Sequence, residues 1–478
     1  MRHVLLSLGI LLILTVSSLT AQVPRRSFLF KDARGELAQA RARGEMDVLL
    51  VIASMPDQNE QVAQAIAGLG GTVQFQADEV DYIRARVPVD GVEELVSHSA
   101  VHSVDISITG SRAFGMAADA PVLPNSEDFS ASGILSEAVN PDTIIWPPVL
   151  SDYPITNRYS PLFDIRASEF LDSNPTYDGR GVKIAMIDMN PDPLLPELQV
   201  ATDLDGQPIR KIGVYGTAQD LEEEDDGRWI RMEDMVTAAD GQFTYGDNTY
   251  VAPKDGTFRI ALFHEARDSL ATFGGSLEND VNRDGNPEGS SRLFGVLWDE
   301  ETDDVWVDTN QDLSFADQTA LTDYNDRPEF GVFGTDDPDT PIRESVAFGI
   351  QIAQEKKLIA LNLGSASHAT LVVGAALANR GSEGRFDGVA PGAQLISIAE
   401  GGSAYGQIES PLISIRDHGA EVVYFEQSSN ITRNYLLRDG RLVPTVIYER
   451  LIDRYDPVIL SPTHNYPILG GIDDFVMA

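Results

Sequence analysis

The chain has 478 residues, contains no cysteine and carries a formal net charge of −39 at pH 7. This length is enough for two or three domains with buried cores, and the lack of cysteine excludes disulfides, thiolate metal sites and a cysteine nucleophile. An acidic excess of this size argues against nucleic-acid binding through phosphate contacts, whereas it is compatible with calcium binding and with solubility outside the cell.

Residues 1–21 have the three-part pattern of a secretory signal peptide. Arg2 and His3 precede an apolar run from Val4 to Val16, and small residues lead up to Ala21. We expect cleavage after Ala21, and a secreted or periplasmic mature protein. The apolar run is shorter than the about 20 residues that a bilayer requires, so no stable membrane anchor is expected. An uncleaved anchor is the alternative.

Residues 45–109 alternate short strands with helices. Apolar periodicity predicts strands at 48–52, 73–75, 82–87 and 101–108. Asp57 with Glu60 has the spacing of a capping box at the start of the first helix, and Asp90 is placed to cap the second. The order β-α-β-β-α-β predicts a ferredoxin-like α+β domain. A generic α+β module is the alternative.

A second, larger domain is predicted from residue 164 to residue 478, after a proline-rich linker and lead-in at 110–163. A short helix over 165–171 precedes an apolar strand that ends at Asp188. In open α/β sheets, functional groups gather at the carboxyl ends of the strands, so Asp188 is a candidate catalytic residue. Its alternative role is a carboxylate that caps a turn.

The segment from about 200 to 345 is predicted to be a β-rich insertion, with strands at 257–263 and 293–298. Within it, oxygen-bearing side chains alternate around Gly285 as in a calcium loop. The pattern predicts a structural Ca²⁺ site formed by Asp280, Asn282, Asp284, Asn286 and Glu288. The loop at 308–314 is similar, but a leucine replaces the glycine. Solvated turns are the alternative for both loops.

Two further segments carry candidate site residues. His368 opens an apolar run that predicts a buried helix, and Gly388-Val389-Ala390-Pro391-Gly392-Ala393 then predicts a turn before a strand at 394–398. Asn465 follows an apolar strand near 458–460. A histidine at a helix start is more often structural, and an asparagine after a strand is also common in simple turns.

In their order along the chain, the segments around Asp188, His368 and Asn465 resemble the aspartate, histidine and asparagine motifs of the subtilisin-like serine proteases, the subtilases. The turn at 388–393 strengthens the resemblance. The sequence departs from the family pattern at three points. Met189-Asn190-Pro191 replaces Ser/Thr-Gly after the aspartate, Ala369 replaces a glycine, and Pro-Thr-His precedes Asn465.

The resemblance implies a fold and a mechanism. Residues 164–478 would form a partial subtilase catalytic domain, an α/β fold with a mainly parallel sheet flanked by helices. Residues 45–109 would be its inhibitor-type propeptide. The long insertion is similar to that of the tripeptidyl-peptidase II branch. His368 would be the general base, Asp188 would orient it and Asn465 would stabilise the oxyanion during hydrolysis of protein or peptide substrates, without a cofactor.

The serine nucleophile of such a triad is missing. No Gly-Thr-Ser-x-Ala-x-Pro elbow follows Asn465, and the last residues, Phe475–Ala478, are apolar. We therefore expect a truncated chain that is inactive by itself. The alternative is a non-catalytic, subtilase-like binding or scaffold protein that has lost the serine.

Overall fold

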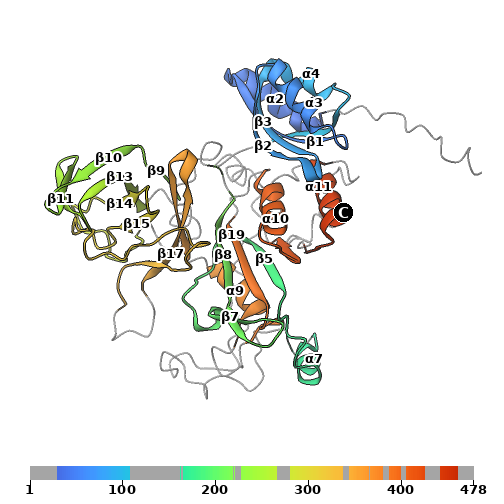
Figure 1. The fold of residues 1–478 in the computed structure, drawn as a ribbon. Helices are drawn as coiled ribbons and strands as arrows, with labels where there is room; N and C mark the ends of the chain where they lie inside the picture. Colours follow the sequence, from blue (N-terminus) through green and yellow to red (C-terminus); the bar gives the residue numbers. More distant parts are fainter. Residues whose placement is uncertain are drawn as a thin grey trace, which may run out of the picture. The chain divides into compact units, whose positions relative to one another are not determined.

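The computed structural model (Figure 1) describes residues 29–107, 162, 165–218, 220, 228–265, 280–336, 344–364, 367–379, 387–399, 405–425 and 442–460. The predicted signal peptide, nearly all of the predicted linker, and Asn465 lie outside these residues. The chain divides into two compact units, residues 1–107 with 436–447 and residues 108–435 with 448–478. In the described part, no helix is long and apolar enough to cross a membrane.

The first unit contains a four-stranded antiparallel sheet with strand order β2-β3-β1-β4. Its elements are β1 (Asp47–Ser54), α3 (Asn59–Gly68), β2 (Thr72–Ala77), η1 (Asp78–Val80), β3 (Tyr82–Pro88), η2 (Val89–Gly91), α4 (Val92–Val96) and β4 (Val101–Ile106). This is the predicted β-α-β-β-α-β order. Leu50, Ile52 and Ile83 are fully buried, because alternate residues of the strands face the helices.

Two features of the first unit differ from the sequence-based prediction. A further helix, α2 (Lys31–Arg43), precedes β1 and buries Ala33, Leu37 and Ala40, which recur on one helical face. The predicted capping box at Asp57 is wrong. The N-cap of α3 is Gln58 rather than Asp57, which lies one residue earlier in the left-handed region at φ 59°, and the helix begins without a side-chain cap.

The second unit contains a five-stranded parallel sheet with strand order β21-β20-β5-β19-β8. Its strands are β5 (Lys183–Asp188), β8 (Ile212–Thr217), β19 (Gln394–Ala399), β20 (Val422–Phe425) and β21 (Val458–Leu460). Among the described residues, helices α7 (Ala167–Ser173), α9 (Ser367–Leu377) and α10 (Gly406–Arg416) belong to this unit, and α11 (Val443–Tyr455) is divided between the two units after Ile447. The α/β class with a mainly parallel sheet is thereby confirmed, and β5 occupies the centre of the sheet.

Antiparallel strands form the other sheets described in the second unit. One sheet has the order β10-β13-β14-β15, the other β16-β17-β18-β9, and two hairpins, β6-β7 and β11-β12, accompany them. The bounds are β6 (Val200–Thr202), η7 (Pro196–Leu198), β7 (Pro208–Arg210), β9 (Trp229–Arg231), β10 (Asp234–Ala238), β11 (Gln242–Tyr245), β12 (Asn248–Val251), β13 (Gly256–His264), β14 (Leu293–Asp299), β15 (Asp304–Val307), β16 (Gly331–Phe333), β17 (Val346–Ala353), η9 (Gln354–Lys356) and β18 (Leu358–Gly364).

The two larger antiparallel sheets span 229–364, which overlaps the predicted insertion at about 200–345 without coinciding with it. The parallel-sheet strand β8 lies inside the predicted segment, and β17 and β18 lie beyond it. We call residues 229–364 the β-rich segment. The two strands predicted inside it, at 257–263 and 293–298, are present as β13 and β14.

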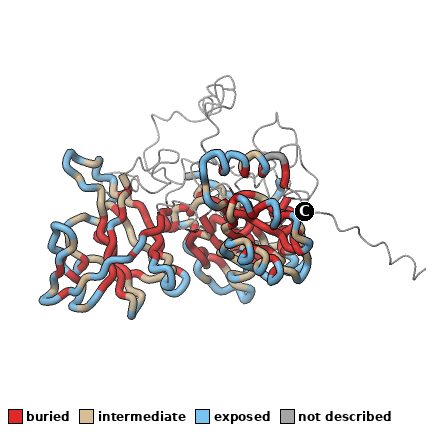
Figure 2. The backbone as a smooth tube through the Cα atoms, turned by 90° about the horizontal axis from the view of Figure 1, so that it is seen from above, coloured by how far each residue is buried: buried red, intermediate tan, exposed pale blue. Residues whose placement is uncertain are grey.

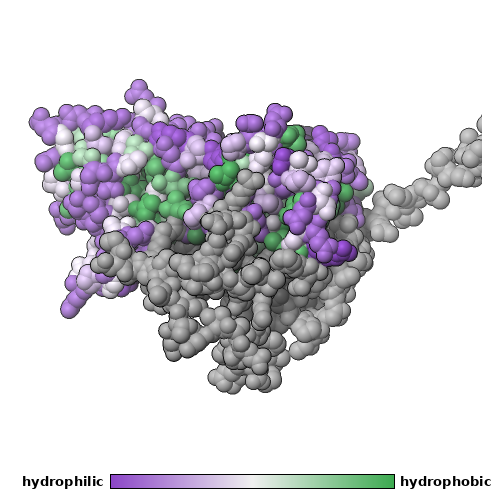
Figure 3. Space-filling view, turned by 90° about the horizontal axis from the view of Figure 1, so that it is seen from below, coloured by the Kyte–Doolittle hydropathy of each residue, from purple (hydrophilic) through white to green (hydrophobic). Residues whose placement is uncertain are grey.

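An aromatic core holds the β-rich segment together. Phe294, Phe333 and Phe348 pack with ring centroids 4.6–5.0 Å apart in successive pairs, and all are buried. Figure 2 shows buried residues along the inner stretches of the described chain and exposed residues mainly at its outer bends. Hydrophilic residues predominate around smaller apolar areas on the face shown in Figure 3, in keeping with the high net charge.

Candidate active site

The structure brings Asp188 and His368 into direct contact. Asp188 is the last residue of β5, and His368 is the second residue of α9. The His368 Nδ1 and Asp188 Oδ2 atoms are 2.8 Å apart. The Asp188 side chain is 4 % exposed and the His368 side chain is 53 % exposed. A buried carboxylate therefore holds one edge of an imidazole that is open to solvent.

This geometry suits a base that is oriented by a carboxylate. The other Asp188 oxygen, Oδ1, accepts a hydrogen bond of 2.7 Å from the Met189 amide, which fixes the carboxylate and favours its ionised form. An ionised carboxylate only accepts hydrogen bonds, so Nδ1 of His368 must carry the proton in this contact. Whenever the ring is neutral, Nε2 is therefore its basic nitrogen.

Three hydrogen bonds anchor the segment that follows Asp188. The Ser397 hydroxyl contacts Asn190 Oδ1 at 2.8 Å, and the Tyr215 hydroxyl donates to the Pro191 carbonyl at 2.9 Å. The Asp192 backbone amide donates to the Thr370 hydroxyl at 2.9 Å. The segment is thus tied to β19, to β8 and to the helix that carries His368.

Two departures from the subtilase pattern face the same surroundings. Ala369 is fully buried in the core of the β-rich segment, and Met189 packs against that core. Both side chains are larger and more apolar than the Ser/Thr and Gly of the subtilase pattern. They fit a site that has the apolar core of the β-rich segment beside the Asp188–His368 pair. Gly364 ends β18 against the same loop, and a Cβ added there would lie 2.4 Å from both the Tyr215 hydroxyl and Pro193 Cδ.

A buried lysine supports the turn at 388–393. The Lys211 side chain is fully buried, and its Nζ donates to the Pro391 and Ala393 carbonyls at 2.6 and 2.8 Å. Burial lowers the pKa of Lys211 to about 7, although the charges of Asp387 and Asp178 oppose this shift. The turn therefore depends on a buried amino group that is costly to keep charged.

Replacing Lys211 by methionine is expected to remove a rise in the free energy of unfolding between pH 7 and pH 9 that the original protein shows. Between its pKa of about 7 in the folded protein and 10.5 when unfolded, the unfolded chain binds more protons. The free energy of unfolding should therefore rise by about 2 kcal/mol from pH 7 to pH 9 in the original protein. Urea unfolding at these two pH values measures the rise.

The control for this experiment is Lys254→Met. Lys254 is 45 % exposed and pairs with Asp299 at 2.7 Å, so its removal should leave the rise with pH in place. A rise that is equally large in the Lys211→Met protein would contradict the role given to Lys211.

In the predicted calcium loop, side-chain carboxylates accept hydrogen bonds from backbone amides of the same loop. Asp280 accepts hydrogen bonds from the amides of Asp284 and Gly285, at 3.0 and 2.9 Å, and Asp284 accepts one from Asn286 at 2.7 Å. Glu288 is exposed. Among the residues that the structure describes, no group of three or more His, Cys, Asp or Glu side chains is placed to hold a metal ion.

The loop at 308–314 has the same amide pattern. Asp308 accepts from the amides of Asp312 and Leu313, at 3.2 and 3.1 Å, and Leu313 adopts φ 65° where the first loop has glycine at φ 75°. Burial raises the pKa of Asp308 to about 6. The two loops are thus alike in backbone geometry, although only one has the residue that tolerates it without strain.

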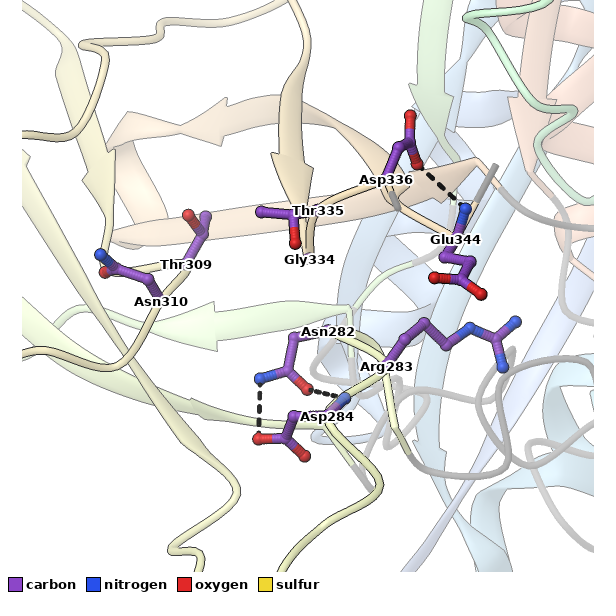
Figure 4. Close-up of a pocket in the computed structure, with 9 residues that line it drawn as sticks. All are labelled: Asn282, Arg283, Asp284, Thr309, Asn310, Gly334, Thr335, Asp336 and Glu344. Atoms are coloured by element: carbon purple, nitrogen blue, oxygen red, sulfur yellow. Dashed lines mark hydrogen bonds between the residues drawn. The ribbon is translucent and has the colours of Figure 1, made fainter. Parts of the chain in front are cut away.

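Both loops line one polar pocket of about 590 Å³, shown in Figure 4. In it, Asn282 donates to Asp284 at 3.2 Å, and Asp336 accepts from the Glu344 amide at 3.0 Å. The lining residues are Asn282, Arg283, Asp284, Thr309, Asn310, Gly334, Thr335, Asp336 and Glu344. The pocket contains two of the five residues of the predicted calcium site and neither Asp188 nor His368.

Sequence patterns alone did not reveal Tyr215, Ser397, Thr370 or Lys211. Each acts through a partner that is distant in the sequence, and three of the four look like ordinary strand or helix residues. In the sequence, Lys211 is only a charged residue next to an apolar strand. This pattern does not indicate burial, because residues at strand ends are usually exposed.

Together, the parallel sheet, the Asp188–His368 pair and the ferredoxin-like first unit resemble a subtilisin-like α/β domain that is preceded in the chain by an inhibitor-type domain. Residues 17–107 match the family model described as "Putative peptidase inhibitor domain". The chain is similar to tripeptidyl-peptidase 2 of Arabidopsis thaliana, with 25 % identity over 324 residues. This match covers 55 % of the chain and 23 % of the plant protein.

A second relative is tripeptidyl-peptidase 2 of Oryza sativa subsp. japonica, 24 % identical over 378 residues, which is 65 % of this chain and 27 % of the rice protein. The chain therefore spans about a quarter of the length of the curated relatives that it matches. These matches confirm the resemblance to the tripeptidyl-peptidase II branch.

Two solved structures are also similar. The crystal structure of tripeptidyl peptidase 2 has a TM-score of 0.44 and 17 % identity, covering 62 % of this chain and 27 % of that chain. Fervidolysin from Fervidobacterium pennivorans, a keratinolytic enzyme related to subtilisin, has a TM-score of 0.35 and 11 % identity, covering 89 % of this chain and 41 % of that chain.

Proposed function

We propose that the chain is part of a secreted serine endopeptidase of the subtilase type, whose nucleophile lies outside these 478 residues. The single observation that carries the proposal is the 2.8 Å contact between a buried Asp188 and a half-exposed His368. The contact joins the two segments that resemble the aspartate and histidine motifs, at the carboxyl end of the central strand of a parallel sheet.

In this proposal, His368 Nε2 takes the proton of a serine hydroxyl as the oxygen attacks the peptide carbonyl. Asp188 keeps the proton on Nδ1 and stabilises the imidazolium that forms. The Asn465 amide would donate to the oxyanion of the tetrahedral intermediate, a contact typically worth about 3 kcal/mol. His368 then returns the proton to the leaving amine, and water releases the acyl group by the same steps.

The first unit would be the inhibitor-type propeptide of this peptidase and thus its own first partner. Its match to a peptidase inhibitor domain supports this role. Protein or peptide substrates follow from the proposed reaction, and release of tripeptides is the activity in the name of the relatives. The signal peptide predicted at residues 1–21 supports secretion, and it too is part of the proposal.

The experiment uses the complete natural protein that contains this chain, incubated with peptides that have free or blocked N-termini. Cleavage of blocked peptides indicates an endopeptidase, and cleavage three residues from a free N-terminus indicates a tripeptidyl peptidase. If neither is cleaved after removal of the first unit, the non-catalytic binding or scaffold protein becomes the better account. The intact Asp188–His368 pair favours the peptidase, since a scaffold has no need of it.

We also propose that the loop from Asp280 to Glu288 binds structural Ca²⁺. Asp280 and Asp284 keep further lone pairs when their loop amides are satisfied, because an ionised carboxylate has about four acceptor sites. The side-chain oxygens of Asn282 and Asn286, with Glu288, would complete the ligand set. The ion would hold the loop and take no part in the chemistry.

Removing Ca²⁺ is expected to lower the midpoint of thermal unfolding by at least about 3 °C, because an ion that binds only the folded state stabilises it. Differential scanning calorimetry with Ca²⁺ or with chelator measures the shift, and Asp280→Ala should abolish it. Asp205→Ala, in an exposed turn, is the control. An equal response to Ca²⁺ in the original protein and in Asp280→Ala would contradict the proposed site.

A further inference from the structure

Tyr215 lies between the β-rich segment and the loop that follows Asp188. It is fully buried in β8, where its hydroxyl donates to the Pro191 carbonyl at 2.9 Å. Burial raises the pKa of Tyr215 well above its ordinary value, so the hydroxyl keeps its proton and remains a donor. The contact lies three residues from Asp188, beyond Met189 and Asn190.

The position of the Tyr215 ring is set by the β-rich segment. Phe330 meets it edge-on with ring centroids 5.0 Å apart, and Tyr324 lies 5.7 Å away. Gln351 of β17 also docks on β8, since it accepts from the Thr217 amide at 2.9 Å and donates to the Thr217 carbonyl at 3.1 Å. The ring therefore cannot move without a shift in this packing.

The space beyond the hydroxyl is closed as well. Gly364 approaches so closely that an added Cβ would lie 2.4 Å from the Tyr215 hydroxyl and 2.9 Å from the Pro191 carbonyl oxygen. This glycine ends β18, four residues before His368. Tyr215 thus touches the Asp188 loop on one side and the approach to His368 on the other.

We propose that Tyr215 is a positioning residue for the Asp188–His368 pair: its hydroxyl holds the Pro191 carbonyl and thereby fixes the Asp188 carboxylate against His368 Nδ1. The inference rests on the proposed function for its catalytic meaning, although the positioning itself is a property of this chain. It also gives the β-rich segment a role, because Phe330 and Tyr324 hold the ring in place.

Tyr215→Phe tests this, because it removes one hydroxyl and keeps the ring. The chain 1–478 is labelled with ¹⁵N-histidine, and the His368 nitrogen signals are identified by their loss in His368→Gln. Nitrogen shifts at a pH where the ring is neutral give the ratio of the Nδ1–H to the Nε2–H tautomer. We expect Tyr215→Phe to lower this ratio roughly threefold to tenfold, as for loss of one hydrogen bond.

Tyr324→Phe is the matched control. Tyr324 is also buried in the aromatic cluster, but its hydroxyl donates to the Ile212 carbonyl at 2.9 Å rather than to the Asp188 loop. We expect its tautomer ratio to equal that of the original chain. Thermal melting of both variants checks that they fold. General loosening of the core would change the tautomer ratio in both variants, whereas loss of the positioning contact would change it in Tyr215→Phe alone.

Two results overturn the inference alone: an unchanged ratio in folded Tyr215→Phe, or an equal fall in both variants. A different result overturns the proposed function as well. If His368 in the original chain shows no excess of the Nδ1–H tautomer, the Asp188–His368 pair does not form in solution. The two failures are therefore distinguishable within one set of spectra.

Discussion

Asp188→Asn is expected to reduce the kcat of the complete peptidase about 10⁴-fold, with little change in stability. An asparagine at this position presents an amide donor or a weaker acceptor to His368 Nδ1, so the ring is no longer held with its proton on that nitrogen. Nε2 then carries the proton in much of the enzyme and cannot accept one from the nucleophile. Steady-state hydrolysis of a peptide substrate measures the loss.

The matched control is Asp205→Asn, which changes the same side chain in an exposed turn, and it should keep full activity. Asp188 accepts a 2.7 Å bond from the Met189 amide, and an asparagine oxygen can still accept it. Equal melting curves for the two variants would show that the local fold survives. A fall in kcat of less than about tenfold in Asp188→Asn would contradict the role of the pair.

Gly364→Ala should be the most damaging small substitution near the site, with an expected loss of about 3 kcal/mol in the free energy of unfolding. The added methyl group would meet the Tyr215 hydroxyl, Pro193 Cδ and the Pro191 carbonyl oxygen, at 2.4, 2.4 and 2.9 Å. The Tyr215 ring is held by its packing, and the two proline atoms belong to the hydrogen-bonded loop after Asp188, so β18 or this loop must shift. Because His368 follows four residues later, activity should fall as well.

Gly374→Ala is the control for the same chemical change. Gly374 lies inside α9, and an added Cβ would have no heavy atom within 4 Å. Alanine in place of glycine inside a helix should therefore raise the free energy of unfolding by about 0.5–1 kcal/mol. Urea unfolding distinguishes the two variants. If Gly364→Ala unfolds at the same urea concentration as the original protein, the close approach at this glycine is not real.

Much of the fold was predictable because it rests on local patterns. Apolar runs bounded by turn residues predicted β5, β13, β14 and β19, and the alternation of elements predicted the ferredoxin-like first unit. The helix α2 was missed because small residues, Ala33 and Ala40, form much of its buried face amid charged ones. The cap at Asp57 failed because a motif of side-chain types does not specify the backbone dihedral angles.

The site was only partly predictable, for a different reason. Asp188 and His368 stand at ends of elements, where a pattern can single them out. Tyr215 and Lys211 act on carbonyl groups of the chain, and every residue has a carbonyl, so no residue type marks their partners. For Lys211 those partners, Pro391 and Ala393, are 180 and 182 residues away. Only the three-dimensional fold brings them together.

In the proposed peptidase, Asp188 and His368 serve a serine that lies outside these residues. A fluorophosphonate probe, which reacts with activated serines, tests it most directly in the complete natural protein, followed by peptide mapping of the labelled site. We expect one labelled serine on the C-terminal side of Asn465 and loss of the label in His368→Ala. A complete protein that takes up no label, or one whose labelling is unchanged in His368→Ala, would contradict it.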